Sequence, residues 1–477
     1  MNNRPTPSPL LSLVPILILV AMLAVTIHLF GSDALAGGSQ VCLLTASAIC
    51  VLIGMGGYKR TWKEFEDAIT KNIAGIGTAL LILLLIGALS GAWMVCGVVP
   101  TLIYYGIQII DPNFFLVSTC VICAIVSVMT GSSWTTIATI GIALLGIGKA
   151  LGFEEGWIAG AIVSGAYFGD KVSPLSDTTV LASSTVGTPL FTHIKYLLLT
   201  TVPSMLITLI IFTIAGLSFD SPSSIQIAEF TQALGDKFHI SIWLMIVPIV
   251  TGVMIAKRVP SIITLFLSAM LAIVFAFIFQ PELLLEISGT GEGVMSLVKG
   301  GMNTLFGSTS LDAGNAEIND LISTRGMSGM MDTIWLIICA MCFGGAMTAG
   351  GMLASITSVF IRFTKKCVSL VSSTVATGLF MNLTTADQYI SIILTGNMFK
   401  DIYKKNGYDS RLLGRTVEDS VTVTSPLIPW NSCGMTQSTV LGVSTFVYFP
   451  YCFFNYISPL MSIFMAAIGY KIYRLKK

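Results

Sequence analysis

Charge is what this sequence has least of. Only 10% of its 477 residues are Asp, Glu, Lys or Arg, whereas an average soluble domain carries about 25%. Hydrophobic residues make up 54%, and the mean hydropathy is +0.86. So little charge excludes a water-soluble globule and is typical of a polytopic helical membrane protein. The net charge of +1 provides no basic field that would attract nucleic acid.

The groups needed for enzyme chemistry are also scarce. The chain has three histidines: His28, His193 and His239. The stretch 326–329 matches the Gly-x-Ser-Gly of an intramembrane serine protease, but it has no base nearby, and a nucleophile needs one within hydrogen-bond reach. An aspartyl-protease pair of Asp170 and Asp387 is conceivable, although such chemistry has no use for a duplicated chain. The ten cysteines lie mostly in apolar runs, as small buried hydrophobes do. We therefore predict neither an enzyme nor a cofactor.

Long apolar runs are abundant, and two of them are interrupted by proline-containing polar segments. Residues 169–179 read Gly-Asp-Lys-Val-Ser-Pro-Leu-Ser-Asp-Thr-Thr, and residues 424–431 repeat the Ser-Pro-Leu 252 positions later. Proline breaks a helix because it lacks the backbone donor. Breaks at corresponding places in two halves indicate the binding site of a secondary transporter.

Two further apolar runs carry a polar cluster in the middle. Residues 114–151 are interrupted at 131–136, and residues 368–399 at 382–388. The first run is too long for one span of about 20 residues and leaves no room for a loop between two. We therefore predict two re-entrant hairpins with the polar clusters at their tips, where protein or a watery cavity satisfies the irregular backbone. The two clusters share the 252-residue offset.

These elements predict an all-α polytopic membrane protein built as an inverted repeat. We expect about ten transmembrane helices, two re-entrant hairpins and two broken helices. Basic clusters orient the spans and place both termini in the cytoplasm. The predicted parts are a first repeat (1–217, broken span 157–186), a linker (218–237) and a second repeat (238–477, broken span 412–443).

Acidic residues at membrane depth are the most informative side chains. A charge at the bilayer centre costs about 2.5–3.5 kcal/mol, so such groups are functional by default. Asp170, Asp177 and Asp387 are therefore candidate Na⁺ ligands or proton carriers. The structural alternatives are loop residues, salt bridges and helix caps, and Asp177 in particular precedes a helical run that it could cap.

Four other residues have less certain roles at the same depth. Lys171 either neutralises a neighbouring carboxylate or extends to the interface. Glu418 and Asp419 either face the cavity or lie near the cytoplasmic end of the span. Trp430 either walls the cavity or simply packs. We treat these four as candidate substrate or charge-balancing residues.

Neutral oxygens surround the acids in the sequence. Small hard cations such as Na⁺ prefer oxygen ligands, and broken helices add free backbone carbonyls. The predicted Na⁺ is held by Asp170 and Asp177 with help from these groups; the alternative is ordinary interhelical hydrogen bonding. The neutral candidates are Ser132, Ser133, Thr135, Thr136, Ser173, Thr178, Asn382, Thr384, Thr385, Ser425 and Asn431.

Residues 165–179, Gly-Ala-Tyr-Phe-Gly-Asp-Lys-Val-Ser-Pro-Leu-Ser-Asp-Thr-Thr, resemble the signature of NhaC-type Na⁺/H⁺ antiporters. Residues 131–136, Gly-Ser-Ser-Trp-Thr-Thr, resemble that family's first-hairpin motif. The family is similar to the sodium-lactate/malate-proton antiporters of the ion-transporter superfamily. The resemblance implies an inner-membrane exchanger of Na⁺ for H⁺. At the 252-residue offset, Thr422 and Pro429 stand where the first half has Asp170 and Asp177, so the two half-sites differ chemically.

The expected function is antiport by alternating access, with Na⁺ and H⁺ competing for buried carboxylates. The alternative is a carboxylate (lactate or malate) or amino-acid exchanger that uses Lys171 and the helix N-termini at Thr178 and Ser432 for its substrate. A channel is a third class, but nothing indicates a ring-shaped filter. The expected partners are Na⁺, H⁺ and the lipid bilayer. A small organic anion and a second copy of the chain are further candidates.

Overall fold

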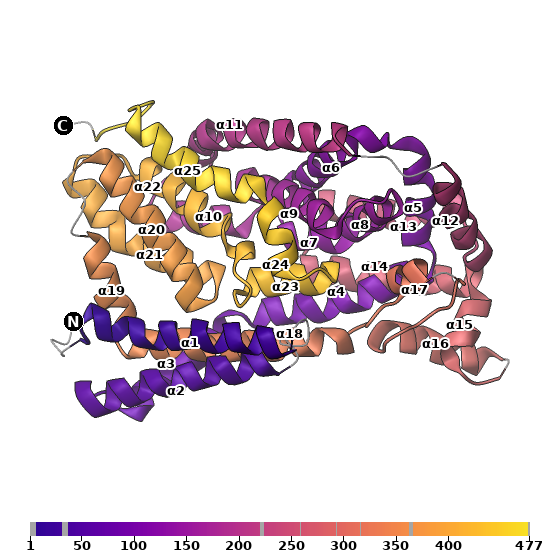
Figure 1. Ribbon diagram of the computed structural model, residues 1–477, viewed down its shortest axis with the longest axis horizontal. Coiled ribbons are helices and arrows are strands. Elements are labelled where there is room, and N and C mark those ends of the chain that lie inside the picture. The colour runs from indigo at the N-terminus through magenta and orange to yellow at the C-terminus, as the bar shows by residue number, and fades with distance from the viewer. Residues whose placement is uncertain are drawn as a thin grey trace.

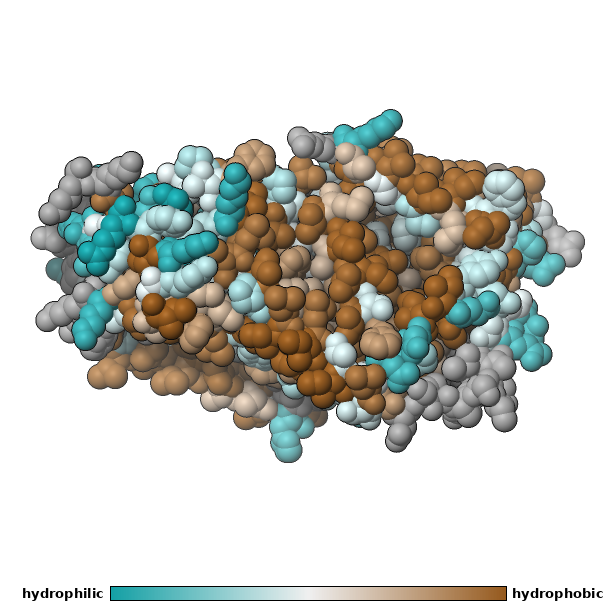
Figure 2. Space-filling model, turned by 90° about the horizontal axis from the view of Figure 1, so that it is seen from above, coloured by the Kyte–Doolittle hydropathy of each residue, from teal (hydrophilic) through white to brown (hydrophobic). Residues whose placement is uncertain are grey.

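The computed structural model describes residues 6–30, 37–219, 224–257, 259–291, 293–314, 316–361 and 366–475. Within these ranges the regular structure is helical apart from two isolated β-bridges. Nine of the described helices are long and apolar enough to cross a membrane. Figure 2 shows brown, apolar side chains gathered in a broad band between two more hydrophilic ends. The prediction of an all-α polytopic membrane protein is confirmed.

One side of the molecule is a layer of long helices from distant parts of the chain. In Figure 1, α1 (Pro9–Phe30), α2 (Gly38–Tyr58), α3 (Trp62–Gly75) and α18 (Met331–Ala349) lie side by side along the lower edge. Helix α4 (Gly77–Val95) leads from this layer into the interior. Helix α1 begins, and the last helix ends, at the same end of the molecule.

The first predicted hairpin is a helix, a turn and a second helix. Helix α6 (Phe115–Thr130) ends at Gly131, and the chain continues through α7 (Ser133–Thr136), a π-helical segment (Ile137–Gly141) and α8 (Ile142–Ala150). Each arm is itself long and apolar enough to cross a membrane. Re-entry of this hairpin therefore stays a prediction.

The broken span that follows lies against this hairpin. Helices α9 (Glu155–Val172) and α10 (Asp177–Val186) are separated by the segment 173–176, and α11 (Leu190–Leu217) follows. Helix α9 packs closely on α6 because glycines face it: a Cβ on Gly165 would lie 2.1 Å from the Cys120 carbonyl oxygen. Small residues four apart allow such close helix contacts in membranes. This contact holds the end of α9 beside the hairpin tip.

The remaining helices before the second hairpin are mostly short, apart from α14, and lie mostly at one end of the molecule (Figure 1). Residues 220–223 of the predicted linker lie outside the described residues, and the rest of that linker includes a helix. The helices are α5 (Val98–Ile109), α12 (Ser224–Lys237), α13 (Ile246–Ala256), α14 (Ser261–Phe279), α15 (Pro281–Ser288), α16 (Val294–Phe306), α17 (Ala316–Ile322) and α19 (Met352–Ile361).

The second half contains the same pair of elements. Helices α20 (Cys367–Thr385) and α21 (Gln388–Lys405) form a hairpin that turns at Ala386. The broken span consists of α22 (Ser410–Val417), a π-helical segment (Glu418–Thr422), a 3-10 turn and α23 (Ser432–Leu441). Helices α24 (Thr445–Tyr448) and α25 (Phe453–Ala467) end the fold, with α25 along α11.

Helix-capping residues recur in the two halves at a constant spacing of 255 residues. The 252-residue register from Ser-Pro-Leu is therefore wrong by three positions. The reason is that Ser425-Pro426-Leu427 forms a 3-10 turn before the second break, whereas Ser173-Pro174-Leu175 lies within the first. The matching caps are Gly131 and Ala386, Ser132 and Asp387, Glu154 and Asp409, Ser176 and Asn431, and Gly187 and Gly442.

Candidate functional site

Asp170 lies buried where the first hairpin tip meets the first break. Its side chain is 4% exposed near the C-terminal end of α9. One carboxylate oxygen accepts a hydrogen bond from Ser133 Oγ at 2.7 Å, and the other accepts one from Ser176 Oγ at 2.6 Å. Both partners are neutral hydroxyls, so one charged carboxylate and two uncharged oxygen atoms lie together, and all three are of the type that binds small cations.

The break itself is built from local hydrogen bonds. Ser176 caps α10 by accepting from the Thr179 backbone N–H, and its hydroxyl also pairs with that of Thr178 at 2.8 Å. Thr179 Oγ1 donates to the backbone carbonyls of Asp170 and Lys171 at 3.2 and 3.0 Å. Ser173 donates to the Val128 carbonyl on α6 and is turned toward the hairpin backbone. The carbonyls freed at the end of α9 are thus partly satisfied by hydroxyls of the same motif.

The remaining hydroxyls of the first tip hold the turn together. Ser132 caps α7 by accepting from the Thr135 backbone N–H, and the Thr135 hydroxyl contacts the same oxygen at 3.1 Å. Thr136 donates to the Ser132 carbonyl at 2.9 Å. Of the four predicted hydroxyls in this tip, Ser133 alone has a hydrogen bond to Asp170.

Asp177 is the first residue of α10, and its side chain is exposed. It accepts from Tyr389 Oη of α21 at 2.8 Å and from the Thr178 backbone N–H at 3.0 Å. Two more contacts join the halves nearby: Lys400 donates to the Thr185 carbonyl, and the hydroxyls of Thr188 and Ser410 are 2.8 Å apart. Asp177 therefore belongs to the boundary between the halves.

Lys171 does not reach an interface. Its side chain is fully buried and forms an ion pair with Asp419, which is equally buried. Ser458 bridges the two, 2.8 Å from Lys171 Nζ and 2.9 Å from Asp419 Oδ1, and Thr200 donates to the same oxygen at 3.1 Å. Lys171 thus pairs with a buried carboxylate, and its predicted role in balancing charge stays a prediction. Glu418, next to Asp419, is also fully buried, and within the part of the chain that the structure describes neither of its carboxylate oxygens has a hydrogen-bond partner at normal distance.

The second hairpin tip carries its acid at the cap. Asp387 is buried and caps α21 by accepting from the Ile390 backbone N–H at 2.9 Å. Its other oxygen accepts from Ser432 Oγ on α23 at 3.1 Å. Thr385 donates to the Asp387 carbonyl and contacts Ser391, whereas Thr384 donates to Phe380 within its own helix. Asp387 is therefore a helix cap, which was the structural alternative to a binding role. Its carboxylate also places a charged oxygen at the site.

Side-chain amides and hydroxyls satisfy the backbone of the second break. Asn382 donates to the Val421 carbonyl at 2.7 Å, and Asn431 caps α23 while donating to the Asn382 carbonyl. Trp430 Nε1 donates to the Leu383 carbonyl at 2.8 Å, so it ties the break to the hairpin. Ser425 Oγ donates to Gln388 Oε1 at 2.8 Å.

This last contact repeats the first half-site. In the 255-residue register, Ser425 corresponds to Asp170 and Gln388 to Ser133, and each pair is hydrogen bonded. Hairpin tip and broken helix therefore meet at matching positions in both halves with different chemistry. In the first the broken helix supplies the acceptor, and in the second it supplies the donor.

Several residues of the site were not among the sequence candidates. Ser176 was missed although it lies within the signature, and its place before an apolar helical run is the signal of an N-cap. Gln388 was noted only as part of the second polar cluster. Tyr389, Thr200 and Ser458 were also missed. Their contacts join the two halves, and such contacts leave no signal in the local sequence.

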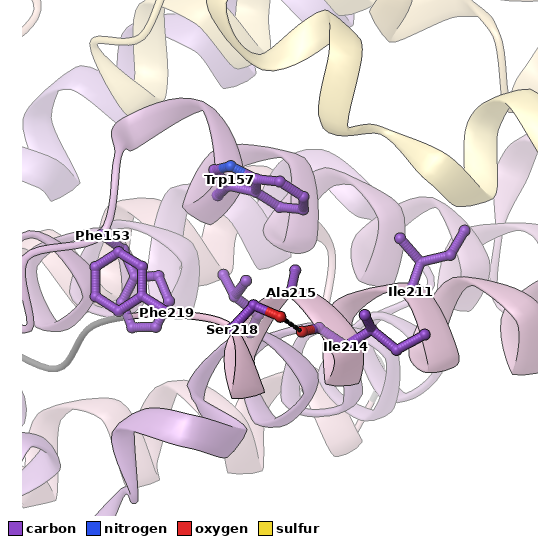
Figure 3. A pocket seen from close by; sticks show the side chains of 8 residues that line it. Phe153, Trp157, Ile211, Ile214, Ala215, Ser218 and Phe219 are labelled. Atoms are coloured by element: carbon purple, nitrogen blue, oxygen red, sulfur yellow. Dashed lines mark hydrogen bonds between the residues drawn. The ribbon is translucent and has the colours of Figure 1, made fainter.

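A large surface pocket lies elsewhere, and its chemistry is apolar. The cavity has a volume of about 430 Å³. Figure 3 shows the side chains that line it, which include Phe153, Trp157 and Phe219 together with aliphatic residues. Ser218, its only polar lining residue, has its hydroxyl 2.8 Å from the Ile214 carbonyl of its own helix. Such a groove suits acyl chains better than an ion.

Comparison with known proteins gives one consistent answer. The sequence pattern of the Na⁺/H⁺ antiporter family matches residues 8–185 and 165–470 of this chain. The Na⁺/H⁺ antiporter NhaC of Alkalihalophilus pseudofirmus is 36% identical over 90% of this chain and 89% of its own length. The malate-2H⁺/Na⁺-lactate antiporter of Bacillus subtilis is 35% identical over 92% and 91%. The arginine/ornithine antiporter ArcD of Halobacterium salinarum is 33% identical over 97% and 92%. All three bear the names of antiporters, and none that of an enzyme.

Proposed function

The chain belongs to the Na⁺/H⁺ antiporter family, and from this premise we propose that it exchanges Na⁺ for H⁺ across the bacterial inner membrane by alternating access. Both termini would lie in the cytoplasm. The observation that carries this proposal is the buried Asp170 carboxylate, which two neutral hydroxyls hold at the junction of a hairpin tip and a helix break.

This arrangement suits one small cation or one proton at a time. A carboxylate with hydroxyl and carbonyl neighbours supplies the hard oxygen donors that Na⁺ needs. A proton on the same carboxylate removes its charge and with it most of the attraction for Na⁺. Burial favours that neutral form, so the two ions compete at Asp170. Loading one ion therefore expels the other.

Asp177 and Asp387 have supporting roles in this proposal. Asp177 would complete the Na⁺ site when the halves rearrange, since it lies on the same break and contacts Tyr389 of the second hairpin. Asp387 would serve from the opposite half, where its carboxylate lies between the tip of α21 and the start of α23. The nearby hydroxyls of Thr178, Thr385 and Ser432 are neutral oxygens within reach of those acids.

Alternating access would come from rocking of two inverted repeats, residues 1–217 and 238–477. The 255-residue spacing of the caps supports a repeat. The contacts that would have to change include those between α10 and α21, such as Asp177 with Tyr389 and Lys400 with the Thr185 carbonyl. These are single hydrogen bonds near the surface, so breaking them costs less than separating the buried contacts of α9 and α11 with the second half.

Exchange of organic anions is a less well supported function than Na⁺/H⁺ exchange. Its cationic ligand was to be Lys171, but that side chain is held by Asp419 and Ser458. The relatives named for malate and lactate or for arginine and ornithine make these solutes useful in a test.

Transport by purified protein in liposomes tests the proposal. A Na⁺ gradient should drive proton movement, read with an internal pH dye, with no added organic solute. Lactate, malate, arginine and ornithine are added one at a time. Proton movement that requires one of these solutes, or that persists unchanged in Asp170→Asn, would reject the proposal.

A further inference from the structure

The second broken helix carries a row of buried polar groups that the proposed Na⁺ site does not use. Glu418 and His193 are both fully buried, and among the described residues no polar atom of the carboxylate or the imidazole has a hydrogen-bond partner at normal distance. The Thr422 hydroxyl, also fully buried, interacts with the Glu418 carboxylate only at longer range. An unpartnered polar group in the interior costs about 1–3 kcal/mol, and a charged one more. Apolar side chains would pack the same space without that cost.

These groups follow one face of the helix. His193, near the start of α11, packs on Gly414 of α22: a Cβ there would lie 2.7 Å from the imidazole Cε1 and 2.8 Å from Nδ1. Glu418 lies four residues beyond Gly414, and Thr422 four beyond Glu418, so the three positions lie roughly above one another. The stretch Glu418–Thr422 is π-helical. Such π-bulges occur often at functional sites.

The row leads toward Asp170. Glu418 precedes Asp419 in the chain, and Asp419 is ion-paired with Lys171, the residue that follows Asp170. No hydrogen bond joins Glu418 to Asp170 within the described part of the chain. The row therefore begins at the end of α22 that is capped by Asp409 and passes alongside the Lys171–Asp419 pair to the first half-site.

All the charged or titratable groups near the row can be named. On α9 they are Asp170 and Lys171; on the same helix as Glu418 they are Asp419 and Arg415. Arg415 lies over the ring of Tyr196 on α11, 4.7 Å from its centroid, and interacts electrostatically with Tyr403 on α21. Lys171 is held by Asp419, which leaves Glu418 as the acid in this row with no cationic partner of its own.

We propose that His193 and Glu418 carry protons between the Asp409 end of α22 and Asp170, by a route that Na⁺ does not follow. The inference rests on the proposed Na⁺/H⁺ exchange and adds the proton's path to it. The neutral imidazole of His193 takes up a proton on one ring nitrogen and releases one from the other; the released proton passes through water to the Glu418 carboxylate, so that an O–H bond forms as an N–H bond breaks. Glu418 then passes the proton to the Asp170 carboxylate when Na⁺ leaves. Intervening water completes the relay and satisfies Thr422. The net charge of the row therefore changes by one elementary charge when it gains or loses a proton.

Two assays on the same proteoliposomes separate this path from the Na⁺ site. One measures Na⁺ uptake driven by a pH gradient. The other measures exchange of radioactive for unlabelled Na⁺ at equal pH on both sides, which needs the Na⁺ site and the conformational change but no net proton movement. Glu418→Gln should lower the first rate roughly 100-fold, the usual loss when a positioned proton-transfer group is removed. It should leave the second within about 2-fold of the wild type.

Two variants control for packing. Glu418→Asp keeps the titratable group and should restore part of the pH-driven uptake. Ser420→Ala alters the same π-helical segment at a hydroxyl that donates to the Thr416 carbonyl and takes no part in the row, so it should leave both rates unchanged. His193→Gln should reduce pH-driven uptake roughly 10-fold, because water can still reach Glu418 from that end.

Either of two results would overturn the inference. Undiminished pH-driven uptake in Glu418→Gln would show that protons take another path. Loss of Na⁺/Na⁺ exchange in Glu418→Gln that Glu418→Asp does not restore would assign Glu418 to the fold or the Na⁺ site. Absence of Na⁺/H⁺ exchange in the wild-type protein is a different failure, since it rejects the proposed function itself.

Discussion

The two hairpin–helix units of this protein place their acid at different positions of the same frame. In the first, Asp170 is on the broken helix and the hairpin tip is capped by Ser132. In the second, Asp387 caps the hairpin tip, and the broken helix carries Ser425 at the position of Asp170. Each half-site thus has one buried carboxylate at this junction, but on opposite elements.

The comparison separates what the fold requires from what the chemistry requires. A helix N-cap needs only an oxygen acceptor, so Ser, Asp and Asn serve equally well at positions 132, 387 and 431. The contact between tip and broken helix needs one donor and one acceptor in either order. These hydrogen bonds therefore do not by themselves require a charged residue at either position.

The largest expected effect concerns the buried ion pair between Lys171 and Asp419, which joins the halves. Lys171 corresponds to Pro426 and Asp419 to Ser164 in the 255-residue register, so this pair has no counterpart. Lys171→Met or Asp419→Asn alone leaves a buried charge unpaired and should lower the free energy of unfolding by about 3–5 kcal/mol. The double variant should recover most of that loss, as measured by unfolding in detergent micelles; additive losses would contradict the pairing.

The next largest effect on transport is expected from the chemical difference between the two half-sites. Asp170→Asn keeps the side chain's size but removes the charge, and Na⁺-driven proton movement should fall about 100-fold, since a charged contact contributes up to about 3 kcal/mol. Ser425→Ala, at the matching position, loses a neutral hydrogen bond and should slow exchange by less than about 10-fold. Equal losses would mean that both half-sites carry the same chemistry.

The hairpin tips give a third test. Gly131 and Ala386 both have left-handed backbone, with φ of 68° and 56°. A Cβ on Gly131 would lie 2.6 Å from the Leu175 carbonyl carbon, so Gly131→Ala should cost more than the about 1–2 kcal/mol of left-handed strain alone. Ala386→Gly should gain up to about 1 kcal/mol by removing that strain. Thermal unfolding of both variants in detergent measures the difference, and opposite signs are expected.

A smaller effect is expected at Asp387. Asparagine keeps the oxygen that caps α21 but puts an amide nitrogen where Ser432 donates. If Asp387 assists Na⁺ binding, Asp387→Asn should raise the KM for Na⁺ about 10-fold, the equivalent of one charged hydrogen bond, with little change in stability. An unchanged KM would leave Asp387 as a cap only.

The smallest effect is expected at the N-terminal caps of the two broken helices. Asp409 caps α22 and pairs with Arg411, with exposed fractions of 23% and 29%, whereas the matching Glu154 makes no side-chain cap. The hydrogen bond from Arg411 lowers the pKa of Asp409. Its stabilisation is therefore complete above the unfolded pKa of about 4 and is lost as pH falls through the lower folded value. Asp409→Asn should cost less than about 1 kcal/mol at pH 7, and the cost should vanish in acid; Glu154→Gln should be neutral throughout.

Much of the site was predictable because its signals are local. Charge and proline inside apolar runs indicated both breaks and both tips, and two of the candidates from different elements, Asp170 and Ser133, are hydrogen bonded in the structure. Asp177 was placed at the same site, yet its side chain is exposed and contacts Tyr389. The register of the halves was wrong by three residues, because identical letters, Ser-Pro-Leu, adopt different backbone in the two breaks.

The sequence alone determined the class of the protein and the depth of its acids. Hydropathy acts residue by residue, and the cost of burying charge applies wherever the apolar run lies. Only the tertiary structure decided which acid is paired, which is exposed and which has no partner. Those outcomes depend on side chains more than 200 residues apart, such as Lys171 and Asp419, whose meeting is fixed by helix packing and by no local pattern.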